Sequence, residues 1–267
     1  MRLSLVQSTK SNRYLIWQLA KREIIGRYRG SALGLAWSLI HPMLMLVVYT
    51  FVFAVVFRAR WGVGEAETKG DFALVLFAGL IINNLFAECI NRAPTLIVQN
   101  INYVKKVVFP LEVLPLVSAG SAVFHAGVSL VVLLVAQLIL RHSLPWTIVL
   151  FPLLITPLLI ATIGASWFLA SLGVYLRDVA HLTGLFTTVM LFMSPVFYPV
   201  SALPVELQPW LSLNPLTFIL EAGRGLLLFG QIPNLFVCAG YWLGSLVVAT
   251  LGFWWFQHTR QGFADVL

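Results

Sequence analysis

The sequence predicts an all-α polytopic membrane protein with six transmembrane helices, and composition and charge spacing are the reasons. Of its 267 residues, 60% are hydrophobic and only 10% are charged, whereas a soluble globular protein carries about 25% charged residues. The charges stand in short stretches that separate long apolar segments. Because little sequence lies outside those segments, we expect residues 1–267 to form a single transmembrane domain.

The formal net charge of +7 would favour a nucleic-acid partner in a soluble protein. In this chain the basic residues flank the apolar segments, and positive flanks act as topology signals in membrane proteins. We therefore expect membrane lipids around the chain and no nucleic-acid partner.

A basic, amphipathic lead-in at 12–31 is expected to form an interfacial helix on the membrane surface. Residues that recur at three- and four-residue spacing share one face of this helix: Trp17, Ala20, Ile24 and Tyr28. The charged side chains lie largely off that face. The alternative is a basic flank that only orients the first span.

The first apolar span, 33–57, contains no Asp, Glu, Lys or Arg. Its 25 residues exceed the roughly 20 that cross a ~30 Å hydrocarbon core. A cleaved signal peptide would begin nearer the N-terminus and would be shorter. Five more spans are predicted, at 72–90, 113–140, 146–175, 183–199 and 235–256.

Polar side chains within the spans have simple expected roles. Glu88 lies four residues before Arg92, the favoured orientation for a helical ion pair. His125 has no carboxylate at metal-ligand spacing, so we expect it to be a packing residue. Cys89 and Cys238 show neither metal nor disulfide spacing. The fourth span carries small residues suited to close helix packing in lipid: Gly164, Ala165, Ser166, Ala170, Ser171 and Gly173.

Short polar connections join the spans and set their orientation. Pro94 and Pro110 bracket a segment long enough for one short helix. With the N-terminus inside, twelve Lys and Arg residues fall in cytoplasmic segments and five in external ones. The excess on one side predicts that both termini are cytoplasmic.

The segment 200–234 is amphipathic and is expected to lie on the external side. Pro204 is expected to open one short helix. A second helix is expected to have Asn214 as its N-cap, Pro215 at its first position and Gly230 past its end. On that helix, the side chains of Glu221 and Arg224 lie three residues apart and can pair.

Enzyme motifs are missing from the sequence. It contains no G-x-x-x-x-G-K-[ST] phosphate loop, no G-x-S-x-G and no H-E-x-x-H. Without a phosphate loop, we expect no nucleotide hydrolysis on this chain. A transport scaffold is the function that the pattern favours.

Five strings resemble, in order and spacing, the permease subunit of bacterial type-2 ABC exporters. They are RYRGSALGLAWSLIHPMLMLVVYTFVF, NINYVKKVVFPLEVLPL, YLRD, SPVFYP and NPLTFILEAGRGLLLFG. All of them lie between Arg22 and Gly230, a region that makes up most of the chain. The branch that they resemble exports lipid-linked polysaccharide, which is O-antigen, capsule or teichoic acid. At Leu111 the chain departs from its relatives, which often carry a basic residue there.

The resemblance implies a homodimer in the bacterial cytoplasmic membrane with two copies of a soluble ATPase beneath it. ATP and Mg would bind that ATPase, and no cofactor would bind this chain. The ATPase contacts implied by the resemblance are Arg22, Arg27, Arg29, Asn100, Lys105, Lys106, Arg177 and Asp178. An external gate of two short re-entrant helices is implied for the segment with Pro204, Asn214, Pro215, Glu221 and Arg224.

Aromatic side chains are candidates for the substrate path, because sugars stack on aromatic faces while sliding past them. On the first and fifth spans these candidates are Trp37, Tyr49, Phe53, Phe192, Phe197 and Tyr198. The alternative role for each is packing or lipid contact.

Other functions stay open on the sequence alone. One is a type-2 exporter permease for a small hydrophobic compound. Another is a membrane-embedded enzyme that acts on lipid-linked sugars through Glu88 or Asp178. A third is a structural or assembly subunit, which would tolerate aromatic substitutions in the first and fifth spans.

Overall fold

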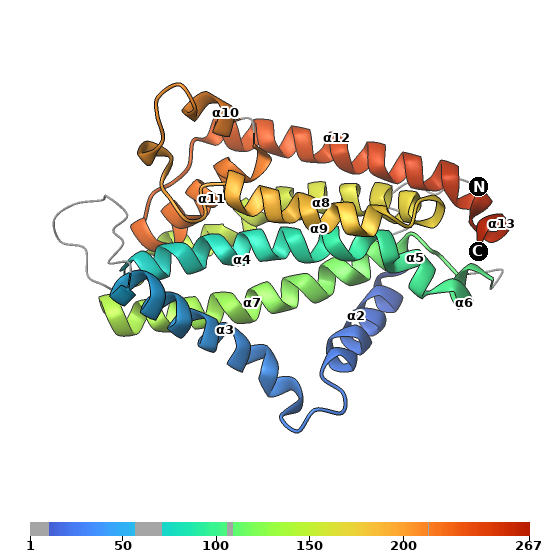
Figure 1. Cartoon of the computed structure of the whole chain (residues 1–267), viewed down its shortest axis with the longest axis horizontal. Coiled ribbons are helices and arrows are strands. Elements are labelled where there is room, and N and C mark those ends of the chain that lie inside the picture. The colour runs from blue at the N-terminus through green and yellow to red at the C-terminus, as the bar shows by residue number, and fades with distance from the viewer. Residues whose placement is uncertain (1–10, 57–70, 106–108, 213) are drawn as a thin grey trace.

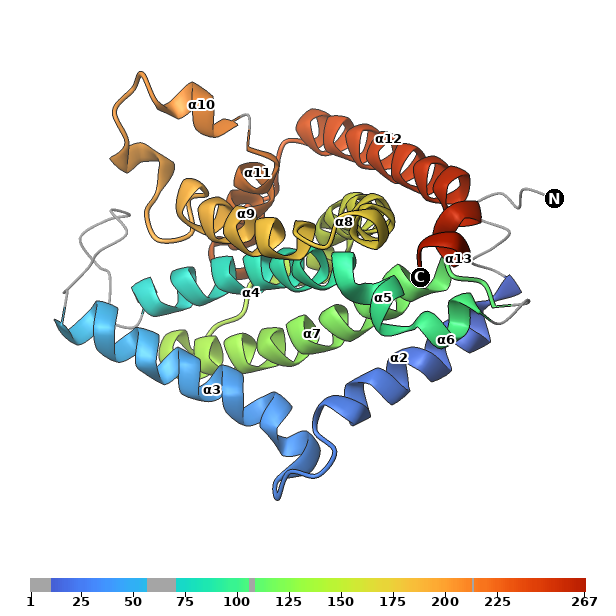
Figure 2. The same ribbon diagram turned by 45° about the vertical axis from the view of Figure 1, so that its right-hand side comes forward.

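The computed structural model describes residues 11–56, 71–105, 109–212 and 214–267. Among these residues there is no strand, and most of the long helices run side by side (Figures 1 and 2). The long helices are α2 (Arg13–Arg27), α3 (Trp37–Tyr49), α4 (Asp71–Arg92), α7 (Val113–Arg141), α8 (Phe151–Tyr175), α9 (Val179–Met193) and α12 (Leu235–Thr259).

Short helical elements extend or connect the long helices. They are η1 (Gly34–Ala36), η2 (Thr50–Val56), η3 (Ala93–Thr95), α5 (Leu96–Gln99), α6 (Ile101–Val104), η4 (Trp146–Leu150), η5 (Val200–Ala202), α10 (Gln208–Ser212), α11 (Pro215–Arg224), η6 (Gly225–Phe229), η7 (Arg260–Gly262) and α13 (Phe263–Val266). The end of the bundle with α2, α6 and α13 is called the α2 end. The opposite end, with α10 and α11, is the α10 end (Figure 1).

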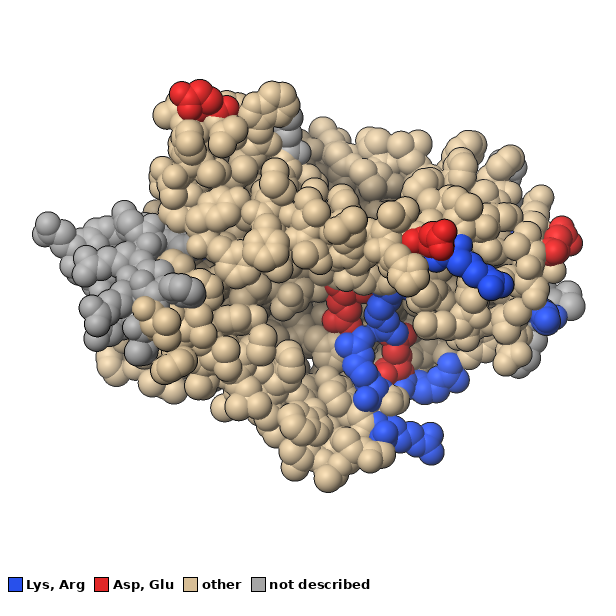
Figure 3. All heavy atoms as spheres, in the orientation of Figure 1, with Lys and Arg blue, Asp and Glu red and all other residues tan. Residues whose placement is uncertain are grey.

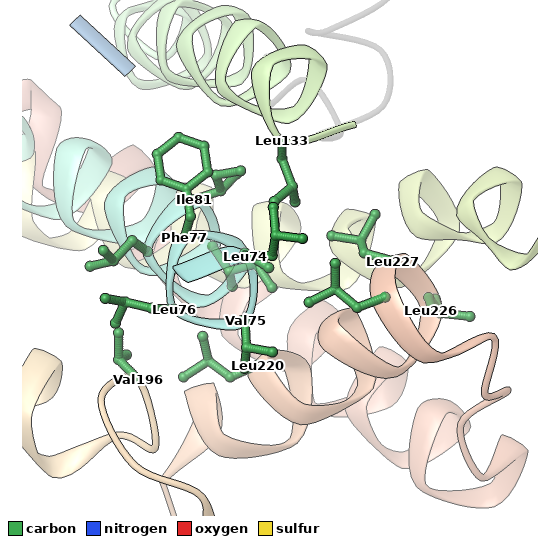
Figure 4. Packing of buried hydrophobic residues seen from close by; sticks show 14 of the residues in the cluster. Leu74, Val75, Leu76, Phe77, Ile81, Leu133, Val196, Leu220, Leu226 and Leu227 are labelled. Carbon is green, nitrogen blue, oxygen red and sulfur yellow. The ribbon is translucent and has the colours of Figure 1, made fainter. Parts of the chain in front are cut away.

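The core surrounds α4. This helix is apolar on nearly every side through its first three turns, and such a helix is stable only when it is buried all round. Its side chains from Phe72 to Ile82 are accordingly buried. Figure 4 shows them meeting residues of α7, α11, η6 and the segment after α9: Leu133, Leu220, Leu226, Leu227 and Val196.

Glycine contacts join α8 and α12, as the small residues of the fourth span predicted. A Cβ on Gly252 would lie 2.0 Å from the carbonyl oxygen of Gly164, so the two backbones touch there. Gly173, which is also on α8, contacts η3 in the same way, because a Cβ there would lie 2.1 Å from the carbonyl oxygen of Pro94. Glycine is required at each of these contacts.

Five helical stretches in the described part of the chain are long and apolar enough to cross a membrane: Gly34–Phe53, Asp71–Gln99, Val113–Arg141, Trp146–Tyr175 and Leu235–Val266. They correspond to five of the six predicted spans, although residue 57 of the first lies outside the described residues. The remaining prediction, 183–199, differs from the structure.

The helix of the predicted fifth span, α9, begins earlier and ends earlier than expected. It starts at Val179 and stops at Met193, and the chain from Ser194 to Pro199 is not helical. Pro195 explains the early end, because the residue before a proline is driven out of the helical conformation. Ser194 accordingly has an extended backbone, with ψ of 153°.

The lead-in forms the predicted helix, α2, but its buried side faces protein. Ala20 is 7% exposed and packs against Val113 and Val117 of α7. Trp17, which was predicted on the same face, is 67% exposed. The short side chain of Ala20 lets α2 approach Gly120, where a Cβ would lie 3.4 Å from that of Ala20.

The connections confirm some predictions and correct others. The single helix expected between Pro94 and Pro110 is two single turns, α5 and α6, and α5 continues α4 through η3. The helix expected to open at Pro204 begins at Gln208. Pro209 accounts for the shift, because its ring would clash with a helix that had started four residues earlier.

The second helix expected in the segment 200–234 begins as predicted. Asn214 caps α11 by accepting a hydrogen bond from the backbone N–H of Leu216 at 2.9 Å, and Pro215 takes the first position. Gly230 ends the following η6 with φ of 67°, a left-handed conformation that favours glycine.

Candidate functional site

Arg224, the last residue of α11, lies at the centre of the α10 end and is only 3% exposed. Its guanidinium donates to three backbone carbonyls: Nε to Val75 at 3.0 Å, Nη1 to Pro195 at 2.5 Å and Nη2 to Val196 at 2.7 Å. Gly79 of α4 leaves the space for this group, since a Cβ there would lie 2.3 Å from Nη2. One side chain thus joins α11, α4 and the segment after α9.

These hydrogen bonds serve the non-helical residues from Ser194 to Pro199. Backbone groups outside a helix are costly at membrane depth unless the protein itself satisfies them. Arg224 satisfies two of the carbonyls, and Asn214 Nδ2 donates to Ser194 Oγ at 2.9 Å. Arg224 and Asn214, with the segment that they hold, are called the Arg224 clamp.

Four phenylalanines stack beside the clamp. The ring centroids of Phe53 and Phe72 are 5.5 Å apart, those of Phe53 and Phe197 are 6.2 Å apart, and those of Phe192 and Phe197 are 5.6 Å apart. Neighbouring ring planes differ by 25–28°. This aromatic ladder joins the end of α3 to the end of α9, and Tyr198 donates to the carbonyl of Phe192 at 2.9 Å.

The structure brings together part of the predicted aromatic path. Phe53, Phe192 and Phe197 lie in the ladder, and Tyr198 lies next to it. Tyr49 is half-buried against the main core. Trp37 is the first residue of α3 and Tyr49 is the last. At a rise of 1.5 Å per residue, the two lie about 18 Å apart along the helix axis.

A second anchor at the α10 end was missed by sequence reasoning. Arg141, at the end of α7, pairs with Asp71, at the start of α4, with an Nε–Oδ1 distance of 2.5 Å. Its Nη1 also donates to the carbonyl of Leu228 in η6 at 2.9 Å, and Thr147 donates to Leu226 at 2.6 Å. The sequence contained a signal for this pair, because two antiparallel neighbouring spans place the start of one, Asp71, beside the end of the other, Arg141.

A charged network ties α2 to α4 and α7. Arg27 Nη2 donates to Glu88 Oε1 at 2.5 Å, and Nη1 lies 3.1 Å from His125 Nδ1. The hydroxyl of Tyr28 lies 3.1 Å from His125 Nε2. Burial raises the pKa of the Tyr28 phenol above its ordinary value. These four residues are called the Arg27 network.

Further charged groups extend the network toward the α2 end. Arg92 pairs with Glu23 of α2 and lies 3.8 Å from Glu88, so the predicted helical pair exists but is the longer contact. Arg22 donates to the hydroxyl of Tyr103 at 2.7 Å. On the face drawn in Figure 3, acidic and basic side chains gather near α2 and toward that end, apart from acidic atoms near α10.

His125 corrects an expectation from the sequence. It was predicted to be a lone packing residue, but Glu88 Oε1 lies 3.4 Å from its Nδ1. The carboxylate belongs to α4 and the imidazole to α7, so no local spacing could have paired them. Within the described residues, no group of three or more His, Cys, Asp and Glu could hold a metal ion.

The residues predicted to contact an ATPase belong, where the structure describes them, to elements toward the α2 end (Figure 1). All of the charged ones that are described are exposed: Arg22, Arg27, Arg29, Lys105, Arg177 and Asp178. Arg27 is also engaged in its network. Asn100 caps α5 by donating to the carbonyl of Leu96 at 2.8 Å. Lys106 lies outside the described residues.

The residues predicted for an external gate divide into two groups. Asn214 and Arg224 form the clamp, and Pro215 begins α11 beside them. Pro204 and Glu221 are exposed.

The comparison with known proteins agrees over nearly the whole chain. The model of the ABC-2 type transporter family matches residues 14–228. An O-antigen export system permease protein, RfbA, of Myxococcus xanthus is 27% identical over 265 residues, which is 98% of this chain and 99% of the relative. Two proteins of the same name from Klebsiella pneumoniae are each 24% identical over 255 residues, 95% of either chain. Since the family model matches most of the chain, this protein is a member of the ABC-2 type transporter family.

Proposed function

We propose that the chain is the membrane-spanning permease subunit of an ATP-driven exporter of O-antigen, a polysaccharide exported on a lipid carrier. The observation that carries the proposal is the match to relatives named O-antigen export permeases over at least 95% of both chains. Two such chains and two copies of a separate ATPase would form the exporter, with ATP and Mg bound by the ATPase.

The proposed topology has six crossings of the bacterial inner membrane, with both termini and the α2 end in the cytoplasm. α9 has 15 residues, which rise only about 22 Å. The residues from Ser194 to Pro199 form turns and bends that lead on from α9, and we propose that they complete the fifth crossing. The Arg224 clamp supports this route, because it satisfies carbonyls that lipid would leave unpaired.

In this arrangement α11 and η6 are re-entrant elements on the external side, and α10 lies outside them. The segment 200–234 would act as the gate. The aromatic ladder would line the exit of the path, where flat apolar rings let sugar rings slide.

The second copy is proposed to pack on α3 and α9. Both helices expose a row of large apolar side chains, and in a helix bundle such rows are covered either by lipid or by another helix. The row on α3 includes Met43, Leu44 and Val47, and the row on α9 includes Leu182 and Leu185. Six helices from one chain would enclose too narrow a path for a polymer, which supports the dimer.

The first experiment is purification of the tagged chain from its native membranes, followed by identification of co-purifying proteins. We expect an ATPase with a phosphate-binding loop in a one-to-one ratio, and loss of O-antigen from the surface of cells that lack the chain. Export of a small hydrophobic compound with O-antigen unaffected would favour the other exporter function. Activity on lipid-linked sugars without any ATPase would favour an enzyme.

The ladder gives a second test of the same proposal. Replacing Phe53 and Phe197 together by leucine removes two stacking faces while keeping most apolar volume. We expect surface O-antigen to fall roughly tenfold, as a loss of ~1.4 kcal/mol would give, while basal ATP hydrolysis is retained. Phe168→Leu is the control, because this ring lies beside α12 and contacts Trp255. Unchanged export in the double variant would contradict a path along the ladder.

A further inference from the structure

A cavity of about 360 Å³ lies between α2, α3, α4 and α7, next to the Arg27 network. Its volume falls in the range of small-molecule sites, roughly 300–1,000 Å³. The polar groups that line it come from all four helices: Arg27, Ser38, His41, Asn84, Glu88, His125 and Ser129. This space is called the α2–α7 cavity.

Two polar side chains of the cavity lack a partner in the described part of the chain. Asn84 on α4 and His41 on α3 are exposed, and neither makes a hydrogen bond to another described residue. Polar side chains on membrane helices are costly unless they meet a partner or a polar cavity. An amide and an imidazole together supply both donors and acceptors.

The indole ring of Trp37 supplies an apolar wall to the same space. It begins α3, is 40% exposed and lines the cavity with Pro42 and Ile81. An exposed indole combines a flat apolar face with an N–H donor. The cavity therefore offers one stacking face and several hydrogen-bonding groups.

Charge balance narrows the class of ligand. The guanidinium of Arg27 is already paired with Glu88 at 2.5 Å, so the cavity has no unbalanced arginine for a phosphate. An added anion would also lie near the Glu88 carboxylate. An acyl chain would leave Asn84 and His41 without partners, which is unfavourable. An uncharged, hydroxyl-rich ring satisfies both the polar groups and the indole.

We propose that the α2–α7 cavity binds one sugar ring of the exported saccharide, stacked on Trp37 and hydrogen-bonded by Asn84 and His41. This inference rests on the proposed function and adds a recognition site at the end opposite the aromatic ladder. The site selects the sugar part of the substrate and not its lipid or phosphate part.

The test is saturation-transfer NMR on the purified full-length chain in detergent. The probe is an equimolar mixture of glucose, galactose, mannose and N-acetylglucosamine. We expect transfer to the ring protons of at least one sugar. Asn84→Leu, which keeps the volume but removes the amide, and Trp37→Leu should each lower the signal roughly tenfold, the effect of ~1.4 kcal/mol. Trp37→Phe should retain part of it.

Matched controls separate the cavity from non-specific sugar contact. Asn102→Leu changes an exposed asparagine of α6, and Trp254→Leu changes an exposed tryptophan of α12. Both should leave the signal unchanged. Equal signals in all variants, or no transfer to any of the four sugars in the unaltered chain, would overturn the proposal.

The binding measurement needs neither ATP nor a partner chain. Its failure would therefore remove the sugar site and leave the export proposal standing, since that proposal is tested by co-purification and surface O-antigen. If Trp37→Leu does not fold, Trp37→Phe and Asn84→Leu still decide the outcome.

Discussion

At the scale of single residues, Arg224 shows how a buried charge can hold backbone together. Its planar fork points three N–H groups at carbonyls of two other segments. A lysine ammonium is a compact charge without that fork, and it cannot reach all three oxygens at once. The contact therefore depends on the shape of the guanidinium as well as on its charge.

We predict that Arg224→Met lowers the free energy of unfolding by about 3 kcal/mol, because buried carbonyls lose their donor. Arg224→Lys should recover less than half of this loss. SDS titration of the purified chain measures both values. Arg13→Met, which changes an exposed arginine of α2, is the control. Full stability of Arg224→Lys would show that charge alone suffices.

Gly79→Ala tests the same contact while keeping the arginine. The added methyl would lie 2.3 Å from Arg224 Nη2, so the guanidinium must move, and we expect a loss of about 1–3 kcal/mol. Gly127→Ala is the matched control, since nothing lies within 4 Å of its Cβ position and alanine favours a helix.

A double-mutant cycle makes the interpretation specific. When Arg224 is already methionine, Gly79→Ala should cost much less, because the two residues act through one contact. Additive costs in the double variant would contradict a direct contact between them.

At the scale of elements, α2 is held to the bundle by an apolar contact around Ala20 and by polar contacts that include the Arg27 network. Ala20 packs on α7, and Arg27 reaches Glu88 of α4. Lead-in helices on a membrane surface usually face lipid, but this one has a protein partner on that side. Movement of α2 would therefore be transmitted directly to α4 and α7.

We predict that Ala20→Leu separates α2 from α7, because the larger side chain has no space against Gly120. Trypsin should then cut at Lys21 or Arg22 roughly tenfold faster, the ratio given by ~1.4 kcal/mol of lost packing. Gln18→Leu, an exposed position of the same helix, should leave the rate unchanged. Equal rates in both variants would mean that the Ala20 contact does not hold α2.

Local signals explain which elements could be predicted from sequence. The start of α11 was predicted correctly because Asn214 and Pro215 are adjacent and act on the helix that begins there, and Gly230 likewise acts locally at the end of η6. The end of α9 was not predicted correctly, because the apolar run continues past Pro195 and no charged residue marks the end of the helix. Hydropathy reports burial in lipid or protein and not whether the backbone stays helical.

Partners distant in sequence explain what was missed at the site. Arg224 was expected to pair with Glu221, and the two charges do interact. The carbonyls to which Arg224 donates, however, lie 149, 29 and 28 residues away. The same holds for His125, whose partners come from α2 and α4. Residue spacing identifies pairs within one helix, and only the packing of helices brings these groups together.

At the scale of the whole molecule, the exposed charges at the α2 end favour a soluble partner there. We predict that Arg177→Ala and Asp178→Ala each reduce the co-purified ATPase at least fivefold, as a loss of ~1 kcal/mol gives. The amount of chain in the membrane should not change. Quantitative mass spectrometry of the purified complex measures the ratio.

The control for this prediction lies at the other end of the molecule. Glu206 is equally exposed but belongs to the α10 end, so Glu206→Ala should leave the ATPase ratio unchanged. A normal ratio in both α2-end variants would remove Arg177 and Asp178 from the proposed contact.

The backbone contact between α8 and α12 has a mechanical meaning for the molecule. Two helices that touch through Gly164 and Gly252 cannot rotate or slide without a steric clash, because packed interiors deform little. We expect α8 and α12 to move as one rigid unit during any cycle of opening and closing. Displacement must then be concentrated in contacts that can exchange partners. These are the hydrogen bonds and ion pairs that join α2 to α4 and α7, and the stacked rings that join η2 to the residues after α9.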